Sequence, residues 1–408
     1  MRHAALLAAV LLAACADAPD PTPAAADRPT AASGEVAVPA DSGALAPRLV
    51  LDDAGVPLLS WVEPADSGHV LRYARWAGDG WADARTADAA TDWFVNWADT
   101  PGVVPTADGR LVAHTLPRHP DGGSPYAYDA AVRQMTASGW GGWTDRQLLH
   151  DDGVAAEHGF VSAVALPDGR TGLVWLDGRN QGGGHGGDHH AGSMTLRYAA
   201  LGVDGALSDE AELDARACDC CPTAAALTAS GVVVAYRDRS AAEVRDIAVV
   251  RLVDGAWTEP AVPHADDWTL AGCPVNGPAL ASRGDRVALA WFAAPDSARV
   301  QLAVSDDGGA TWGDRVRIDG GMPLGRVGVA MLDDGSAVVS WLETVGDLAE
   351  VRLRRVGPDG APGAPVTVAT VEAGRSTGVP RVVSVDGRAL VAWTDASAGT
   401  VRTAVVDV

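Results

Sequence analysis

Four cysteines lie in two short loops where they could hold a metal ion or form disulfides. Three of them make a Cys-x-Cys-Cys group and the fourth follows in the next sequence repeat: Cys218, Cys220, Cys221 and Cys273. In an exported protein an even set of cysteines favours two disulfides, with neither of the adjacent Cys220 and Cys221 bonded to the other. A Cu or Zn site is the alternative, because thiolates suit a soft tetrahedral ion. Free thiols are the third possibility.

A glycine-rich segment carries further metal-ligand residue types. His185, His189 and His190 lie within it, and His158 lies on a loop that we expect to be close by. Imidazoles in such a group could ligate a metal ion. The segment is also long enough to reach over a binding site as a lid. The alternative is a polar loop that binds metals only adventitiously.

Carboxylates recur two residues after an aromatic residue that ends an apolar run, at Glu63, Asp177, Asp238, Glu343 and Asp395. Several carboxylates around one opening raise one another's pKa, which is how general acids arise. Asp177, Asp238 and Glu343 are therefore candidate acid or base residues. The alternative is that they accept backbone N–H groups where strands end.

Arginines and an asparagine are the candidate ligand-binding residues. They lie in loops that we expect on the same side of the molecule as the cysteines: Arg237, Arg245, Asn276, Arg326 and Arg375. A guanidinium group binds a carboxylate through two parallel hydrogen bonds. The alternative is pairing with acidic neighbours, and it gains weight because all 31 basic residues of the chain are arginine.

The elements that must position these residues are short strands in a repeating pattern. An apolar run with an aromatic residue or histidine at its end recurs seven times, at Trp61, His114, Trp175, Tyr236, Trp291, Trp341 and Trp393. Each copy has room for four strands, which predicts an all-β protein, a β-propeller of four-stranded antiparallel blades. We expect seven blades, with six as the alternative. Residues 35–38 could supply the outer strand that the last copy lacks.

One turn in the fifth copy has a specific motif, formed by Ser305, Asp307, Gly309, Thr311 and Trp312. It resembles the Asp-box of sialidase-like (BNR-repeat) β-propellers. The resemblance implies a structural hairpin between the third and fourth strands of a blade, on the face opposite the ligand site. It also implies a glycan ligand and, if the protein is an enzyme, glycoside hydrolysis, with Arg237, Arg326 and Arg375 around a substrate carboxylate. The sequence departs from the family in lacking an Arg-Ile-Pro element and a tyrosine with an identifiable glutamate partner.

The N-terminus predicts export. Residues 1–15 resemble a lipoprotein signal peptide in which Cys15 would be lipidated, 16–46 form a Pro-, Ala- and Asp-rich tether, and 47–408 form the propeller. We expect a monomer in the cell envelope, facing the periplasm or the exterior. The net charge of −22 argues against nucleic acid as a partner and against membrane contact other than the lipid anchor.

Two classes of function fit these features. The first is an anchored propeller that binds a glycan or another small polar ligand without full sialidase catalysis, with an active exo-sialidase or other glycoside hydrolase as the alternative. The second is a metal-binding module for assembly of the envelope, with an envelope protein as its partner.

Overall fold

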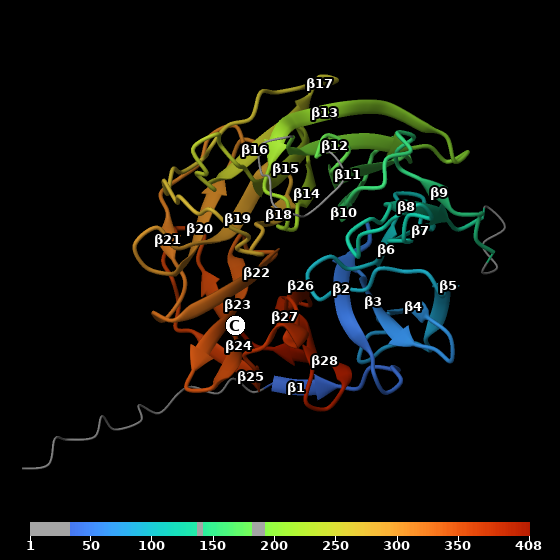
Figure 1. Ribbon diagram of the computed structural model, residues 1–408. Coiled ribbons are helices and arrows are strands. Elements are labelled where there is room, and N and C mark those ends of the chain that lie inside the picture. Colours follow the sequence, from blue (N-terminus) through green and yellow to red (C-terminus); the bar gives the residue numbers. More distant parts are fainter. Residues whose placement is uncertain (1–32, 137–141, 182–191) are drawn as a thin grey trace, which may run out of the picture.

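Seven antiparallel sheets surround a central channel in the computed structural model, which describes residues 33–136, 142–181 and 192–408. Each sheet has four strands, and Figure 1 shows the sheets arranged as blades around a ring. The expectation of a seven-bladed β-propeller is confirmed. Among the described residues, no helix is long and apolar enough to cross a membrane.

The blades follow one another along the chain, with the innermost strand first. Blades 1 to 3 are β2 (Leu45–Leu51), β3 (Pro57–Pro64), β4 (His69–Arg75), β5 (Arg85–Ala90); β6 (Gly102–Pro105), β7 (Leu111–Thr115), β8 (Ala131–Gln134), β9 (Gln147–Leu148); and β10 (His158–Ala165), β11 (Thr171–Asp177), β12 (Met194–Leu201), β13 (Leu207–Ala217). Blades 4 and 5 are β14 (Ala224–Thr228), β15 (Gly231–Arg237), β16 (Ile247–Val253), β17 (Ala256–Trp257); and β18 (Ala279–Arg283), β19 (Arg286–Ala293), β20 (Arg299–Ser305), β21 (Val316–Arg317).

Blade 6 is formed by β22 (Pro323–Met331), β23 (Ala337–Val345), β24 (Leu348–Val356) and β25 (Val366–Glu372). A short 3-10 helix, η1 (Arg375–Thr377), then leads to blade 7, whose strands are β26 (Arg381–Val385), β27 (Arg388–Asp395), β28 (Thr400–Val406) and β1 (Ser33–Val36). The outer strand β1 comes from the opposite end of the described chain. It pairs antiparallel with β28, from Ser33 opposite Val406 to Val36 opposite Thr403, and closes the ring (Figure 1).

The second strand of each blade explains the repeating aromatic residue. Blades pack on both of its faces, so this strand is an apolar run without polar alternation, as in Val232 to Tyr236. All seven aromatic or histidine positions lie in these strands and are at most 4% exposed. Their side chains therefore form much of the core between the blades.

The Asp-box hairpin joins β20 to β21. The Ser305 hydroxyl donates to an Asp307 carboxylate oxygen at 2.7 Å, and the Thr311 N–H donates to Asp307 at 2.8 Å. Gly309 has a φ of 82°, a left-handed conformation that glycine adopts without strain. The Gly308 N–H donates to the Asp285 carbonyl, between β18 and β19. This hairpin therefore lies on the face that carries the turns between first and second strands.

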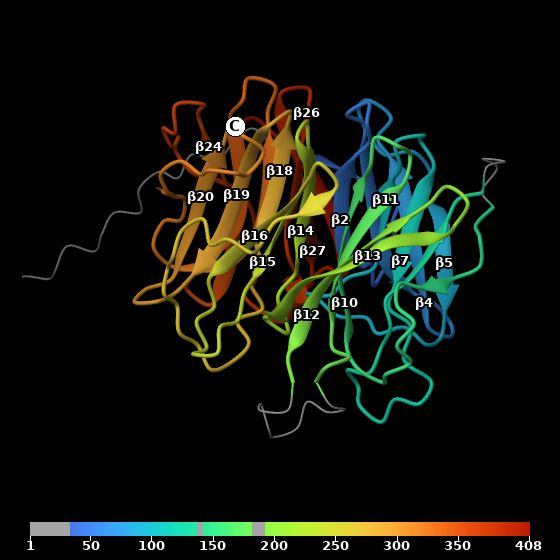
Figure 2. The same cartoon turned by 90° about the horizontal axis from the view of Figure 1, so that it is seen from above.

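The opposite face, which we call the mouth face, carries the starts of the innermost strands and the loops between second and third strands. Figure 2 shows the strands running between these two faces. The loops with the predicted cysteine, arginine and carboxylate residues all lie at the mouth face. Sequence position within each blade was sufficient to place them there.

Candidate functional site

The mouth face is built from repeated backbone irregularities at the starts of the innermost strands. Ala46, Phe160, Val275 and Arg326 have φ values between 49° and 57°. Non-glycine residues rarely adopt this left-handed conformation, and a β-branched residue such as Val275 does so only with strain. Residues that follow these four positions line the channel, at Arg48, Ser162, Asn276 and Val327. No sequence motif predicted this backbone conformation.

Three arginines from three blades line a cavity of about 170 Å³ at the mouth, together with hydroxyl and amide groups. Its lining includes Arg48, Arg326, Arg381, Ser162 and Thr223. Water occupies about 30 Å³ per molecule, so a cavity of this volume can hold a small polar group such as a carboxylate with part of a sugar. Of these arginines, only Arg326 was predicted from the sequence.

Arg381 has no hydrogen-bond or ion-pair partner among the residues that the structure describes, and its Nε atom is buried. Burial and the neighbouring charge of Arg48 lower the pKa of Arg381 to about 9. Arg48 itself donates to the Val161 carbonyl at 3.0 Å, and burial lowers its pKa to about 10 despite the nearby Asp99. Two guanidinium groups thus share a channel wall with little compensating negative charge.

Arg326 is held at the rim by contacts that leave its charge beside the cavity. Its side chain donates to the carbonyls of Gly374 and Gly378 and lies over the Trp97 ring at 4.4 Å. Burial and the nearby Arg375 lower the pKa of Arg326 to about 10. Arg375 is exposed on η1 and does not line the cavity.

Arg237 does not take the ligand-binding place that the sequence suggested. It is 1% exposed, and its guanidinium donates to the backbone carbonyls of Asn276, Arg245 and Phe292 at 2.9, 2.5 and 2.6 Å. These contacts join blades 4 and 5. The buried guanidinium therefore has a structural role.

Asn276 lines the cavity but its amide is also structural. Its Nδ2 donates to the carbonyls of Pro274 and Leu324, and its Oδ1 accepts the Arg326 N–H at 2.6 Å. The last contact needs Gly325, because a Cβ atom there would lie 2.3 Å from Asn276 Oδ1. Asn276 thus fixes the backbone that carries Arg326.

Two of the three candidate acid or base residues accept hydrogen bonds from the tryptophan two residues before them. Trp175 Nε1 donates to Asp177 at 2.9 Å and Trp341 Nε1 donates to Glu343 at 2.6 Å. Burial would raise the pKa of Asp177, but the hydrogen bond from Arg179 and the charge of His158 lower it to about 2. Asp177 is therefore ionised and paired, and neither residue is placed as a proton donor.

Asp238 differs from the other two. Burial is the main cause that raises the pKa of Asp238 to about 6, and the charges of Asp214 and Asp246 add to it. The Arg239 N–H donates to its carboxylate at 2.6 Å. Asp238 could exchange a proton near neutral pH.

The four cysteines converge at the mouth face as free thiols. The disulfides favoured by the sequence are therefore not formed in this structure. Cys218 and Cys221 are buried, with their Sγ atoms 3.4 Å apart, whereas Cys273 is exposed. Hydrogen bonds from Cys220 and Cys221, with the charges of Arg245 and Arg237, hold the pKa of Cys218 well below its usual range. Arg245 Nη1 donates to Cys218 Sγ at 3.0 Å.

His158 belongs to a buried cluster that the sequence did not predict. Its ring stacks on His150 with centroids 3.7 Å apart and planes 11° apart. Asp129 and Asp152 flank the two rings on opposite edges, at 3.1–3.8 Å. Burial and His158 lower the pKa of His150 to about 4. His185, His189 and His190 lie outside the described residues.

This cluster offers metal-ligand atoms, but its two stacked rings do not suit one shared ion. Asp129, His150 and His158 form one possible donor set, and Asp152, His158 and Asp177 form another. Nearly parallel rings cannot both point a nitrogen at one ion lying in their planes. Arg179 already contacts both Asp152 and Asp177, at 3.1 and 2.8 Å.

Tyr128 has the glutamate partner that the sequence did not reveal. Its hydroxyl lies 2.7 Å from an Asp99 oxygen and 2.8 Å from a Glu157 oxygen. Burial raises the pKa of Asp99 to about 7, although the Tyr128 and Phe160 hydrogen bonds oppose this. Tyr128 is fully buried and does not line the mouth cavity. As placed, it cannot act on a ligand in that cavity.

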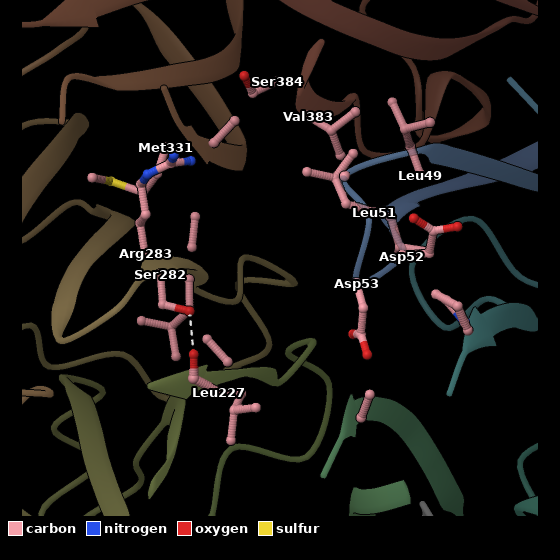
Figure 3. Close-up of a pocket in the computed structure, with 18 of the residues that line it drawn as sticks. Leu49, Leu51, Asp52, Asp53, Leu227, Ser282, Arg283, Met331, Val383 and Ser384 are labelled. Carbon is pink, nitrogen blue, oxygen red and sulfur yellow. Dashed lines mark hydrogen bonds between the residues drawn. The ribbon is translucent and has the colours of Figure 1, made fainter. Parts of the chain in front are cut away.

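The far end of the same channel forms a larger cavity of about 850 Å³. Both cavities share lining residues such as Leu49, Ala163 and Leu280, so they form one continuous channel. Figure 3 shows Leu49, Met331 and Val383 around the far cavity, with Asp53 and Arg283 from different blades. The lining is mostly apolar, and its charged members among the described residues are four aspartates and one arginine: Asp52, Asp53, Asp333, Asp386 and Arg283. The channel is therefore basic at the mouth and acidic at the far end.

Two solved structures with TM-scores above 0.5 share this fold. No family model and no curated protein matches the sequence. A protein of unknown function from Dyadobacter fermentans has 12% identity and a TM-score of 0.51, over 92% of this chain and 98% of its own. An ulvan lyase, a polysaccharide lyase bound to -[GlcA(1-4)Rha3S]-, has 12% identity and a TM-score of 0.53, over 92% and 96%. A mutant of the NanB sialidase from Streptococcus pneumoniae has 9% identity and a TM-score of 0.47, over 86% and 83%.

Proposed function

We propose that this sialidase-like β-propeller binds a small anionic ligand, an acidic sugar or a glycan that ends in one, at its channel mouth. In this proposal it does so as an exported protein anchored in the cell envelope by a lipid on Cys15. The observation that indicates an anionic ligand is the unpartnered guanidinium of Arg381 beside Arg48. A carboxylate between them would relieve the repulsion of two like charges and supply the missing acceptor.

The local field at the mouth favours an anion although the chain carries a net charge of −22. Guanidinium groups of Arg48, Arg326 and Arg381 act at short range inside the channel, where surrounding protein screens them less than water would. The Ser162 and Thr223 hydroxyls in the same lining already donate to the Thr223 and Phe160 carbonyls, so they offer a sugar hydroxyl group only an acceptor oxygen. The ulvan lyase with this fold holds a ligand that contains GlcA, which supports a carboxylate-bearing sugar as the ligand class.

Binding without sialidase catalysis is the function that the geometry supports best. The Tyr128–Glu157 pair is buried beneath the rim, and Asp177 and Glu343 are engaged with tryptophan side chains. Asp99 and Asp238 have raised pKa values of about 7 and about 6. Neither side chain lines the mouth cavity, so catalysis is tested by measuring turnover together with binding.

Isothermal titration of the full chain with glucuronate, N-acetylneuraminate and neutral lactose tests the proposal. The acidic sugars should bind and lactose should not. Arg381→Gln should weaken acidic-sugar binding about 10- to 100-fold, the loss expected for a charged hydrogen bond of about 1.5–3 kcal/mol. Arg388→Gln is the matched control, because Arg388 is exposed at the start of β27 on the opposite face.

Equal binding of lactose and glucuronate, or unchanged affinity in Arg381→Gln, would reject the arginine site. A fluorogenic sialoside assayed in parallel separates binding from catalysis. Turnover that disappears in Asp99→Asn or Asp238→Asn would instead establish glycoside hydrolysis.

A further inference from the structure

Loops from two neighbouring blades bring four sulfur atoms together at the mouth face. Cys218, Cys220 and Cys221 precede β14 of blade 4, and Cys273 precedes β18 of blade 5. The Sγ atoms of the first three all lie within 4.8 Å of one another. Cys273 lies close enough to Cys220 for this contact to lower the pKa of Cys273, although Cys273 is outside the group of three. Three sulfurs therefore face a common point between two blades, with the fourth beside them.

We propose that Cys218, Cys220, Cys221 and Cys273 bind a soft d10 metal ion, Zn²⁺ or Cu(I), which links blades 4 and 5. Four sulfur ligands without carboxylate or imidazole select these thiophilic ions over Mg²⁺, Ca²⁺ or Mn²⁺. Each thiol that ligates the ion releases its proton, so binding strengthens as the pH rises.

The charges around the sulfurs suit a thiolate site. Four thiolates carry more negative charge than Zn²⁺ or Cu(I) neutralises. The negative charge that remains is costly to bury without a positively charged partner. Arg245 is 3% exposed and its Nη1 donates to Cys218 Sγ at 3.0 Å, while its Nη2 pairs with Glu243 at 2.7 Å. The Arg245 carbonyl in turn accepts from Arg237 at 2.5 Å. Such outer contacts orient metal ligands and tune their basicity.

The two loops that carry the sulfurs are in direct contact. A Cβ atom at Gly277 would lie 2.0 Å from the Pro222 carbonyl oxygen, so only glycine fits where the loops meet. Pro222 follows Cys221 directly and Gly277 lies four residues after Cys273. The ligands from the two blades are therefore held at a fixed separation before any ion binds.

One side of the site is open to solvent. Cys218 and Cys221 are buried, Cys220 is half-buried and Cys273 is exposed. An ion can enter past Cys273 without unfolding of the blades. This arrangement suits a site that is loaded after folding.

Metal titration of the reduced full chain tests the proposal. Cys15→Ser leaves four of the five cysteines, and the protein is purified without a histidine tag under anaerobic conditions. Zn²⁺, Co²⁺ as its spectroscopic substitute, and Cu(I) against a competing chelator form separate arms. We expect one equivalent of Zn²⁺ or Cu(I), sulfur-to-cobalt charge transfer typical of tetrahedral thiolate, and protection of the thiols from alkylation.

Cys273→Ser provides a variant that should fold, because its side chain is exposed. Its metal affinity should fall at least about 10-fold. Ala271→Ser adds a hydroxyl to the same loop at another exposed position and should bind as the parent does. The proposal is overturned if neither ion binds the reduced chain or if Cys273→Ser binds like the parent.

Discussion

The Tyr128 hydroxyl contacts both the Asp99 and the Glu157 carboxyl groups. If both carboxyl groups are ionised, the three side chains hold one proton for two hydrogen bonds. The single hydroxyl proton of Tyr128 can be donated to only one of the two carboxylate oxygens that lie 2.7 and 2.8 Å away. The other carboxyl group must then donate to the tyrosine oxygen. This agrees with the raised pKa of Asp99, about 7, which burial causes in the first place.

Asp99 should therefore make the fold less stable as the pH rises. Its pKa is about 7 in the folded protein against 3.8 for the exposed group, so the folded state binds more protons between these values. Stability is lost as the pH rises through this window. Asp99→Asn cannot ionise and does not lose this stability. The difference between its free energy of unfolding and that of the parent should therefore rise by about 3 kcal/mol from pH ~5 to ~8.

Urea unfolding of both proteins across this pH range measures the effect. Asp386→Asn, an exposed carboxylate on the far face, serves as control and should follow the parent. If the free energies of unfolding of Asp99→Asn and the parent changed in parallel with pH, Asp99 would be ionised over this whole pH range and the prediction would be wrong.

Single residues show where sequence reasoning reaches its limit. The sequence pattern located the carboxylates of Asp177 and Glu343 two residues after a tryptophan. It did not predict that each accepts a hydrogen bond from that tryptophan, because this contact depends on the geometry of the strand. Arg48 and Arg381 were missed altogether. Their importance comes from lying side by side across the ring closure, at opposite ends of the sequence, and no local pattern reports that contact.

At the scale of elements, the Asp-box hairpin supports blade 5 and takes no part in the proposed sites. Asp307 accepts hydrogen bonds from the Thr311 N–H and hydroxyl and from the Ser305 hydroxyl. Asp307→Ala should lower the free energy of unfolding by about 1 kcal/mol, as expected for partly exposed hydrogen bonds. Acidic-sugar and metal affinities should not change, because the hairpin is on the far face.

Thermal unfolding and the two titrations check this together. Asp314→Ala is a neighbouring control in which the carboxylate is exposed and lies outside the motif. A loss of ligand affinity in Asp307→Ala at unchanged fold content would contradict the assignment of the hairpin to the far face.

Strands were predictable and loops were not, for a physical reason. Apolar runs such as Val232 to Tyr236 are required wherever a blade packs on both faces, so composition reveals them. The course of a loop depends on which neighbours it meets. Cys273 was expected near Cys221 because both precede the innermost strand of adjacent blades, whereas the stacking of His150 on His158 follows from contacts that have no periodic signal.

At the scale of the whole molecule, ring closure depends on β1. It covers the edge of β28, and the Thr403 hydroxyl donates to the Val36 carbonyl at 2.8 Å. Removal of residues 1–36 should lower the free energy of unfolding by about 2–4 kcal/mol, since several strand hydrogen bonds are lost. The exposed edge of β28 should also promote association.

Removal of residues 1–32 is the matched control, because it ends where β1 begins. Calorimetry and light scattering distinguish the two truncations. Equal melting temperatures and equal monodispersity would show that β1 contributes nothing to closure.

The two ends of the continuous channel differ in charge. Arginines gather at the mouth and aspartates at the far end, so an anionic ligand is attracted only from the mouth face. The thiol cluster lies on that face as well, at the start of blades 4 and 5. The proposed anion and metal sites are thus reached from the same side.

A crystal structure of the protein with glucuronate tests the central claim most directly. The account predicts the carboxylate within hydrogen-bond distance of the Arg48 and Arg381 guanidinium groups in the mouth cavity. A ligand bound elsewhere, or bound at the mouth with its carboxylate turned away from both arginines, would contradict it.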